Sequence, residues 1–163
     1  AFIRNLALSL EGNTLILYQY VDRHGAVLYE DIKNRAGTRS VSFIHGGVAS
    51  SDREEVRSFT EKEADGIIIA SFGTFSTGIN IRNLHNIIFA SPSKSKVRVL
   101  QSIGRALRLG EDKEVATLYD IVDDLSYRDN HNYTLNHFIE RMKIYNQEKF
   151  VYRIYNIKMG EQQ

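Results

Sequence analysis

The stretch Ile67-Ile68-Ile69-Ala70-Ser71-Phe72-Gly73-Thr74 joins four apolar residues directly to a segment of small and hydroxyl-bearing residues. Four further apolar runs lie on either side of it along the chain. Each run is nearly continuous in apolar residues, which is typical of strands in a parallel sheet whose two faces are both covered by helices. The five runs are residues 14–18, 41–44, 67–70, 87–90 and 116–121.

Segments with helical character separate these runs. Residues 22–36 and 96–109 carry apolar side chains at helical spacing, and residues 51–62 open with Ser51-x-x-Glu54, the pattern of a capping box. This alternation predicts right-handed crossovers and a three-layer α/β domain around a parallel sheet. We also expect helices over residues 1–12 and 133–145, and an aromatic tail over residues 150–157 that is either an edge strand or a docking segment.

The composition is that of an ordinary globular domain. The chain has 163 residues, of which 42% are hydrophobic and 25% charged, and no apolar run approaches the length needed to cross a bilayer. The absence of cysteine excludes disulfides and thiolate metal sites and is compatible with a reducing cytosol. Because the net charge is only +1, a nucleic-acid partner would have to be attracted by a local patch.

Three segments that follow predicted strands are rich in glycine, small and hydroxyl-bearing residues. In open parallel sheets, ligands sit outside the carboxyl ends of the strands, and residues of this kind let the backbone approach a phosphate closely. Taken singly, each segment is equally well explained as a good turn. The segments are His45-Gly46-Gly47, residues 71–80 and Ser91-Pro92-Ser93-Lys94.

The segment Gln101-Ser102-Ile103-Gly104-Arg105-Ala106-Leu107-Arg108 is the most informative helix. Gly104 costs about 1 kcal/mol relative to alanine inside a helix, which favours close approach by a ligand or another surface. Arg105 and Arg108 lie one turn apart beside it and could bind a polyanion, since one guanidinium group can hydrogen-bond two phosphate oxygens at once. The alternative is a solvated face on which both arginines pair with nearby acids.

Gln101-x-x-Gly104-Arg105-x-x-Arg108 resembles motif VI of superfamily 2 helicases, and residues 67–81 resemble motif V. Residues 14–20 occupy the place of motif IV, and His45-Gly46-Gly47 that of motif IVa. The resemblance covers residues 12 to 123 in order and spacing. It implies a RecA-like helicase C-terminal lobe over residues 1–125, with residues 126–163 packed on or extending the same domain.

The resemblance implies roles for the residues of motif VI and the end of motif V. Arg108 would be the arginine finger that stabilises charge on the γ-phosphate of ATP, with Arg105 as its partner. Gln101 would orient phosphate or water. Gly78, Asn80 and Gly104 would face the nucleotide, although Asn80 stands where aspartate is more frequent in the family, which puts a ribose or metal-linked role in doubt.

The remaining motif residues would contact the nucleic-acid strand. Most of these contacts would go to phosphates, so they would position the strand without reading its base sequence. For His45, capping of a strand end is an equally good explanation. The residues are Gln19, His45, Gly46, Ser71, Gly73 and Thr74.

Two motifs of an ATP site are absent from the sequence. It contains no G-x-x-x-x-G-K-[ST] phosphate loop and no D-E-x-[DH] segment to hold magnesium. We therefore expect ATP with Mg²⁺ to be held mainly by an N-terminal RecA-like lobe upstream in the same parent chain, in line with a first residue, Ala1, that is not methionine. The fragment alone is expected to be inactive, and its oligomeric state is open.

The motifs do not choose between DNA and RNA. The wording of the motif V loop and the aromatic C-terminal extension are most similar to phage helicases of recombination and repair, which implies DNA unwinding or branch migration in the host cytoplasm. The alternative is a non-catalytic nucleic-acid-binding or docking module derived from a helicase lobe. A complete cofactor-binding enzyme is disfavoured, because Gln19-Tyr20-Val21-Asp22 replaces a glycine-rich loop after the first strand.

Other features are less specific. Asp120, Asp123 and Asp124 are more typical of a solvated turn or of partners for arginines than of a metal site, and no metal site is expected in this chain. In the tail, Phe150, Tyr152 and Tyr155 could stack on a single strand. Packing of the tail against the domain is the expected outcome for such large aromatic residues.

Overall fold

The computed structural model describes residues 1–44, 49–75, 83–91, 116–123 and 133–158. Its core is a five-stranded parallel sheet with the strand order β2-β3-β1-β4-β5. The strands are β1 (Thr14–Tyr18), β2 (Val41–Ile44), β3 (Ile67–Ser71), β4 (Asn86–Phe89) and β5 (Thr117–Asp120). The predicted parallel α/β fold is therefore confirmed, and each predicted apolar run overlaps one strand.

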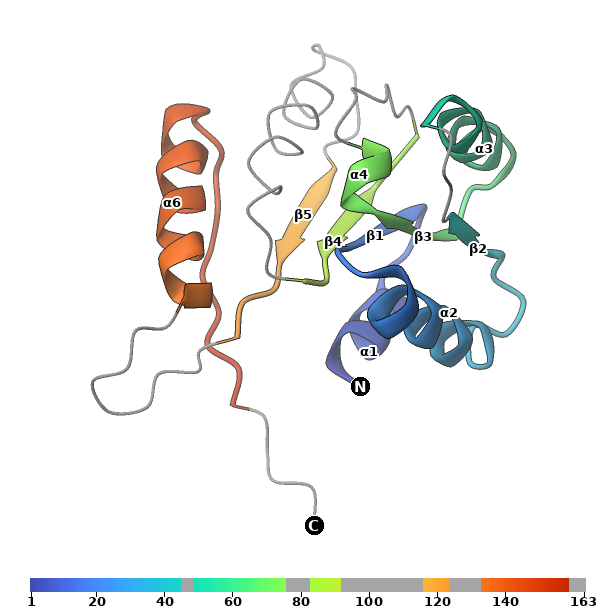
Figure 1. Cartoon of the computed structure of the whole chain (residues 1–163), viewed down its shortest axis with the longest axis horizontal. Helices are drawn as coiled ribbons and strands as arrows, with labels where there is room; N and C mark the ends of the chain where they lie inside the picture. The colour runs from blue at the N-terminus through green and yellow to red at the C-terminus, as the bar shows by residue number, and fades with distance from the viewer. Residues whose placement is uncertain (45–48, 76–82, 92–115, 124–132, 159–163) are drawn as a thin grey trace.

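Helices cover both faces of the sheet (Figure 1). Because side chains alternate along a strand, Leu15 and Leu17 of β1 pack into a first hydrophobic core on one face of the sheet. Ile16 and Tyr18 pack into a second core on the other face. The second core is closed by α1 (Phe2–Ser9) and α2 (Ala26–Lys33), which follows a π-helical turn, η1 (Val21–Gly25). The first is closed by α3 (Ala49–Lys62), the short α4 (Phe72–Phe75) and α6 (Tyr133–Gln147).

Two predicted helix starts differ from the structure. The helix predicted over residues 22–36 begins only at Ala26, because residues 21–25 form the wider turn η1. The helix predicted from Ser51 begins at Ala49, so Ser51 lies inside the first turn and not at the N-cap position. The Glu54 side chain accepts hydrogen bonds from Arg57. The helix predicted over residues 96–109 lies outside the described residues.

Asn13 fixes the amino edge of the sheet, where β1 begins. Its buried side chain donates to the carbonyl oxygens of Glu63 (2.5 Å) and Asn83 (2.9 Å) and accepts from the Gly66 amide (2.9 Å). Its backbone amide donates to His85 Nδ1 at 3.1 Å. One side chain thus joins the connections before β1, β3 and β4.

At the opposite side of the sheet from β2, α6 is held to the end of β5. Arg141 donates from Nε and Nη2 to the two carboxylate oxygens of Asp120, at 2.5 and 3.0 Å, and the Tyr145 hydroxyl donates to Asp120 at 2.8 Å. The Arg141 and Asp120 side chains are only 3% and 9% exposed. Of the two explanations given for this acid, pairing with an arginine is the one that the structure shows.

The aromatic tail contacts the domain through its first two aromatic residues. Phe150 packs against Tyr145 and the core beside it, with 6.3 Å between the ring centroids. Tyr152, although 40% exposed, also contacts the Tyr145 ring, with 6.0 Å between centroids, and its hydroxyl donates to Asn146 Oδ1 at 3.3 Å. Val151 is fully exposed and Tyr155 is 73% exposed. The expectation that the aromatic tail packs on the domain is therefore wrong for Tyr155. No strand forms over residues 150–157, so the edge-strand alternative is also wrong.

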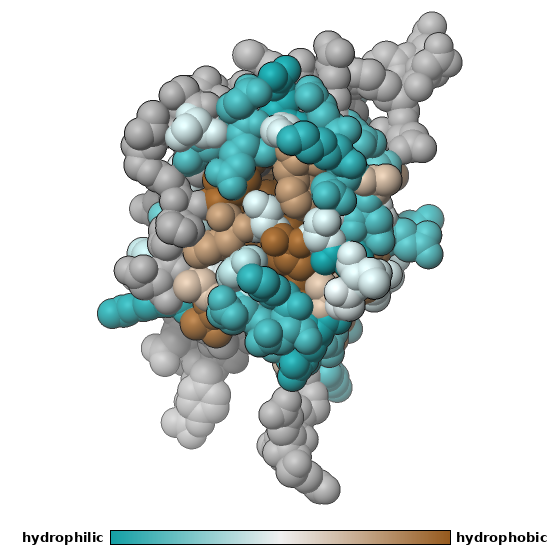
Figure 2. Space-filling model, turned by 90° about the vertical axis from the view of Figure 1, so that its right-hand side faces the viewer, coloured by the Kyte–Doolittle hydropathy of each residue, from teal (hydrophilic) through white to brown (hydrophobic). Residues whose placement is uncertain are grey.

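The other edge of the sheet carries apolar surface. β2 is an edge strand, and its Val41 and Phe43 are only partly buried. Figure 2 shows the molecule from this side, with apolar surface lying between zones of hydrophilic residues. In the part of the chain that the structure describes, no helix is long and apolar enough to cross a membrane.

Candidate functional site

The end of β1 is where the connections of the sheet diverge. From β1 the chain passes to α2 on one face, whereas from the neighbouring β3 it passes to α4 on the other. Ligands of open parallel sheets bind outside the carboxyl ends of the strands at such a divergence. The parallel register places Tyr18 beside Ser71 at this edge, and Phe89 is the last residue of β4 on the other side.

Ser91 links the segments that follow β1 and β4. Its side chain is buried, and its Oγ accepts from the Gln19 backbone amide at 3.4 Å. The same Oγ lies 3.4 Å from His24 Nδ1. These contacts tie together residues that are 67 to 72 positions apart in the sequence, so the segments after the neighbouring strands β1 and β4 form one local structure.

The turn η1 sets the path of the chain after β1. The Tyr20 carbonyl oxygen accepts from the amides of both His24 and Gly25, each at 3.1 Å. A Cβ at Gly25 would lie 2.6 Å from the nearest atom of the Tyr18 ring, so this position requires glycine for close approach. Single π-helical turns of this kind are frequent at functional sites.

Tyr18 lies beneath this turn with its ring fully buried. Its hydroxyl donates to the Ile44 carbonyl oxygen at 3.4 Å, which joins the ends of β1 and β2. Burial, with a smaller contribution from the negative charge of Asp52, raises the pKa of Tyr18 to about 12. The hydroxyl therefore stays protonated at neutral pH and acts as a structural donor, not as a base.

Four of the predicted site residues fall within the described part of the chain, and their backbones lie at this edge. Gln19 follows β1, Ser71 ends β3, and Gly73 and Thr74 lie in α4. The loop expected directly after Ser71 therefore begins as a helical turn. A Cβ at Gly73 would meet only the Ser71 Oγ, at 3.6 Å, among the described residues, so no packing contact there explains this glycine.

The other predicted site residues lie outside the described residues. They comprise the motif IVa pair, the end of motif V and the whole of motif VI. Their proposed roles therefore rest on the sequence alone. They are His45, Gly46, Gly78, Asn80, Gln101, Gly104, Arg105 and Arg108.

Two residues at the edge were not singled out from the sequence. Tyr20, the second residue after β1, is 60% exposed, and His24 contacts it edge-on, with 6.0 Å between ring centroids and 70° between ring planes. An aromatic residue just beyond the end of a continuous apolar strand was the signal that could have drawn attention to Tyr20. Among the described residues, no group of three or more His, Asp or Glu side chains could hold a metal ion.

Comparison with protein families identifies a helicase domain. Residues 1–110 match the model of the helicase conserved C-terminal domain. The matched span contains β1 to β4 and every predicted site residue.

Two curated relatives are helicases. The chain is 35% identical over 164 residues to the ATP-dependent DNA helicase uvsW of Enterobacteria phage T4, an alignment that covers 93% of this chain and 32% of the relative. It is 26% identical over 133 residues to a putative ATP-dependent RNA helicase, MJ1505, of Methanocaldococcus jannaschii, covering 77% of this chain and 17% of that protein. The chain thus spans a third or less of the relatives' length.

Solved structures agree with the sequence comparison. The crystal structure of T4 UvsW matches with a TM-score of 0.68 and 33% identity, over 90% of this chain and 32% of that one. The C-terminal domain of the DEAD-box protein Dbp5 shares the fold, with a TM-score of 0.60 at 19% identity, over 90% of this chain and 77% of that one. The chain therefore belongs to the helicase C-terminal domain family, as a RecA-like lobe of the superfamily 2 type.

Proposed function

We propose that this chain is the C-terminal motor lobe of an ATP-dependent DNA helicase or translocase that unwinds or branch-migrates DNA in recombination and repair. The observation that carries the proposal is the family match over residues 1–110, together with 35% identity to a DNA helicase. RNA is the alternative substrate. The proposed boundaries are a lobe over residues 1–125 and an extension over residues 126–163, and the buried Arg141–Asp120 pair between α6 and β5 supports one folded unit.

The lobe works with an N-terminal RecA-like lobe of the same parent chain, which holds most of ATP and Mg²⁺. Support comes from the sequence, which has no phosphate loop and no acidic magnesium-binding segment of its own. This lobe by itself does not hydrolyse ATP. Gly78, Asn80 and Gly104 face the nucleotide from this side of the interface.

Arg108 is the proposed arginine finger, Arg105 its partner, and Gln101 orients phosphate or water. A finger acts by stabilising negative charge that builds up on the transferring phosphate, and in related phosphoryl-transfer systems it contributes ~10³–10⁵-fold in turnover. All three residues lie within the family match. Arginine suits this role because its charge is permanent and its donors are planar.

The carboxyl edge of the sheet is the proposed strand-binding surface. Gln19 follows β1, Ser71 ends the neighbouring β3, and Gly73 and Thr74 lie in α4 directly after it, which supports a continuous contact with a phosphate backbone. His45 and Gly46 follow β2 in the sequence and complete the set. Binding of this kind releases counterions, so affinity falls as the salt concentration rises.

The test is DNA-stimulated ATP turnover by the parent protein with Arg108→Ala and with Arg105→Ala. We expect a loss of a hundredfold or more in at least one variant, on the scale of a removed finger. Arg35→Ala is the matched control. Arg35 lies just after the end of α2, away from the carboxyl edge of the sheet, and forms an ion pair with Asp31 of that helix. Turnover of this variant should equal that of the wild type.

Unchanged DNA affinity and an unchanged melting temperature are required of each arginine variant, so that a loss reports chemistry. Near-normal turnover in both variants would refute the motor role. The chain would then be a non-catalytic nucleic-acid-binding or docking module derived from a helicase lobe.

A further inference from the structure

We propose that Tyr20 is a stacking platform for one base of a single-stranded nucleic acid at the end of β1. The inference rests on the proposed function and adds a contact of a different kind to it, since the other proposed contacts there are to phosphates. Tyr20 is a large aromatic side chain, yet it is 60% exposed at the edge of the sheet where ligands of this fold class bind.

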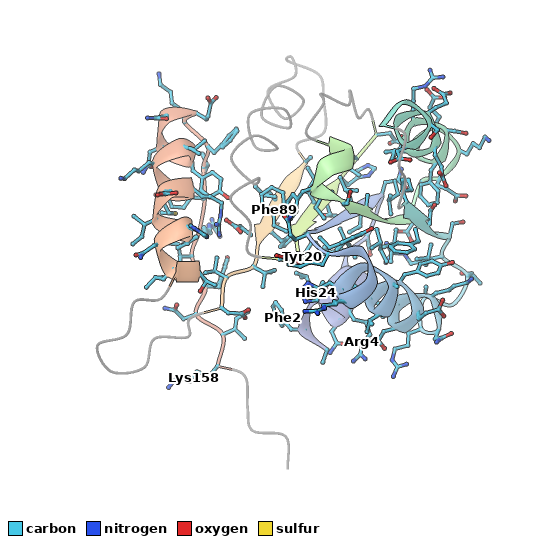
Figure 3. All side chains as sticks on the ribbon, in the orientation of Figure 1. Phe2, Arg4, Tyr20, His24, Phe89 and Lys158 are labelled. Atoms are coloured by element: carbon cyan, nitrogen blue, oxygen red, sulfur yellow. The ribbon has the colours of Figure 1, made fainter. Side chains whose placement is uncertain are left out.

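The exposed ring is held in place by its neighbours. Tyr20 and His24 lie close together after β1 (Figure 3), and His24 contacts the Tyr20 ring edge-on, with 6.0 Å between centroids. His24 Nδ1 is in turn 3.4 Å from Oγ of the buried Ser91. The Tyr20 carbonyl oxygen accepts two amides of η1, which fixes the backbone below the ring. A ring that is already oriented loses little conformational entropy when a flat ligand stacks on it.

The surroundings favour a base over an apolar protein partner. Gln19 precedes the ring, and the turn that follows it carries Asp22, Arg23 and His24, of which Arg23 and His24 are exposed, so the residues around this aromatic side chain are polar. Proteins that bind single strands combine cationic side chains such as Arg23 with aromatic side chains on which bases stack, without reading base identity. The inference therefore concerns any base, in DNA or RNA.

The experiment is equilibrium binding of a fluorescein-labelled single-stranded deoxyoligonucleotide to the parent protein without ATP, followed by anisotropy. Removal of one base–aromatic stack weakens binding about 5- to 150-fold, so Tyr20→Ala should raise the Kd within that range. Tyr20→Phe keeps the ring and should bind within about twofold of the wild type. Val27→Ala, which trims an exposed apolar residue of the adjacent helix α2, is the control and should change nothing.

An abasic oligonucleotide of the same length separates stacking from backbone contact. It keeps every phosphate and lacks every base, so the wild type and Tyr20→Ala should bind it equally. Equal weakening of Tyr20→Ala on both strands, or no weakening on either, would overturn the inference. The same holds if Tyr20→Phe is as weak as Tyr20→Ala.

This readout is independent of the motor test. Affinity is measured without ATP, whereas the proposed function is tested by turnover in the Arg105 and Arg108 variants. A normal Tyr20→Ala affinity with inactive arginine variants would reject the stacking role alone. Normal turnover in the arginine variants would reject the motor role. The comparison of binding to the normal and the abasic oligonucleotide would still test the stacking role of Tyr20.

Discussion

The buried Asp120–Arg141 pair allows a quantitative prediction about α6. Asp120→Asn keeps the size of the side chain but removes its negative charge. Arg141 then keeps a positive charge in a site where its side chain is 3% exposed, with Nη1 already lacking a hydrogen-bond partner among the described residues. The new amide group would also direct N–H donors toward a guanidinium group that can only donate.

The expected cost follows from the burial of the pair. Leaving one member of a buried ion pair uncompensated costs about 3–5 kcal/mol, a large share of the ~5–15 kcal/mol that stabilises a typical domain. Asp120→Asn combined with Arg141→Met removes both charges. Because a well-packed apolar replacement of a buried pair is often neutral, the double variant should be at least ~2 kcal/mol more stable than Asp120→Asn alone.

Hydrogen–deuterium exchange of peptides spanning α6, measured in the parent protein, gives the local opening free energy. A loss of ~3 kcal/mol corresponds to exchange that is about a hundredfold faster, since ~1.4 kcal/mol is a factor of ten. The control is Arg57→Met, which removes an exposed ion pair with Glu54 on α3 and should leave α6 exchange unchanged. Wild-type exchange in Asp120→Asn, or a double variant as labile as the sum of both single ones, would refute the reasoning.

Three further predictions concern stability. Gly25→Ala places a Cβ 2.6 Å from the buried Tyr18 ring and should cost about 1–3 kcal/mol in thermal unfolding, whereas Gly73→Ala, with 3.6 Å to its nearest described neighbour, should fold normally. Gly12→Ala should destabilise by a similar amount, because φ is +80° and the new Cβ would lie 2.7 Å from the His85 ring. The pKa of Tyr18 is raised from 10.0 to about 12 in the folded protein, so the unfolded chain loses this proton at a lower pH than the folded one. The resulting contribution to the free energy of unfolding is fully present below pH 10 and is lost as the pH rises toward 12. Urea titrations should therefore show the wild type losing about 1 kcal/mol more than Tyr18→Phe between pH 9 and 11.

Much of the fold could be predicted because the sheet is buried on both faces. Residues 14–18 and 67–70 are nearly pure aliphatic runs for this reason, and the structure places strands over both. Asn86, which lay outside the predicted run, begins β4 because its backbone amide and side chain bond to Asn13 and Glu11. Such contacts join residues more than 70 positions apart, and no local pattern reveals them.

The structure at the carboxyl edge of the sheet was less predictable, because it too depends on contacts between residues that are not neighbours in the sequence. The helical pattern over residues 22–36 carries no sign that Gly25 must pass over the Tyr18 ring, so the turn η1 was missed. Asp120 left two interpretations open until Arg141, 21 residues away, was placed beside it. The alternation of the tail does not distinguish the packed Phe150 from the exposed Tyr155, because only the position of α6 decides which aromatic side chain reaches a core.

The order of strands in the sheet has a consequence for synthesis on the ribosome. β1 emerges first, yet both of its partners come much later, since Thr14 pairs with Ile67 and with Asn86. At roughly 5–20 residues per second, about 4–14 s pass between the synthesis of Thr14 and that of Asn86. During that time an aliphatic strand with two unpaired edges is available for wrong pairing, and such long-range contacts also make folding slow. A stretch of this kind is a natural target for chaperones, and slowing translation shortly before residue 67 should increase aggregation of the nascent chain.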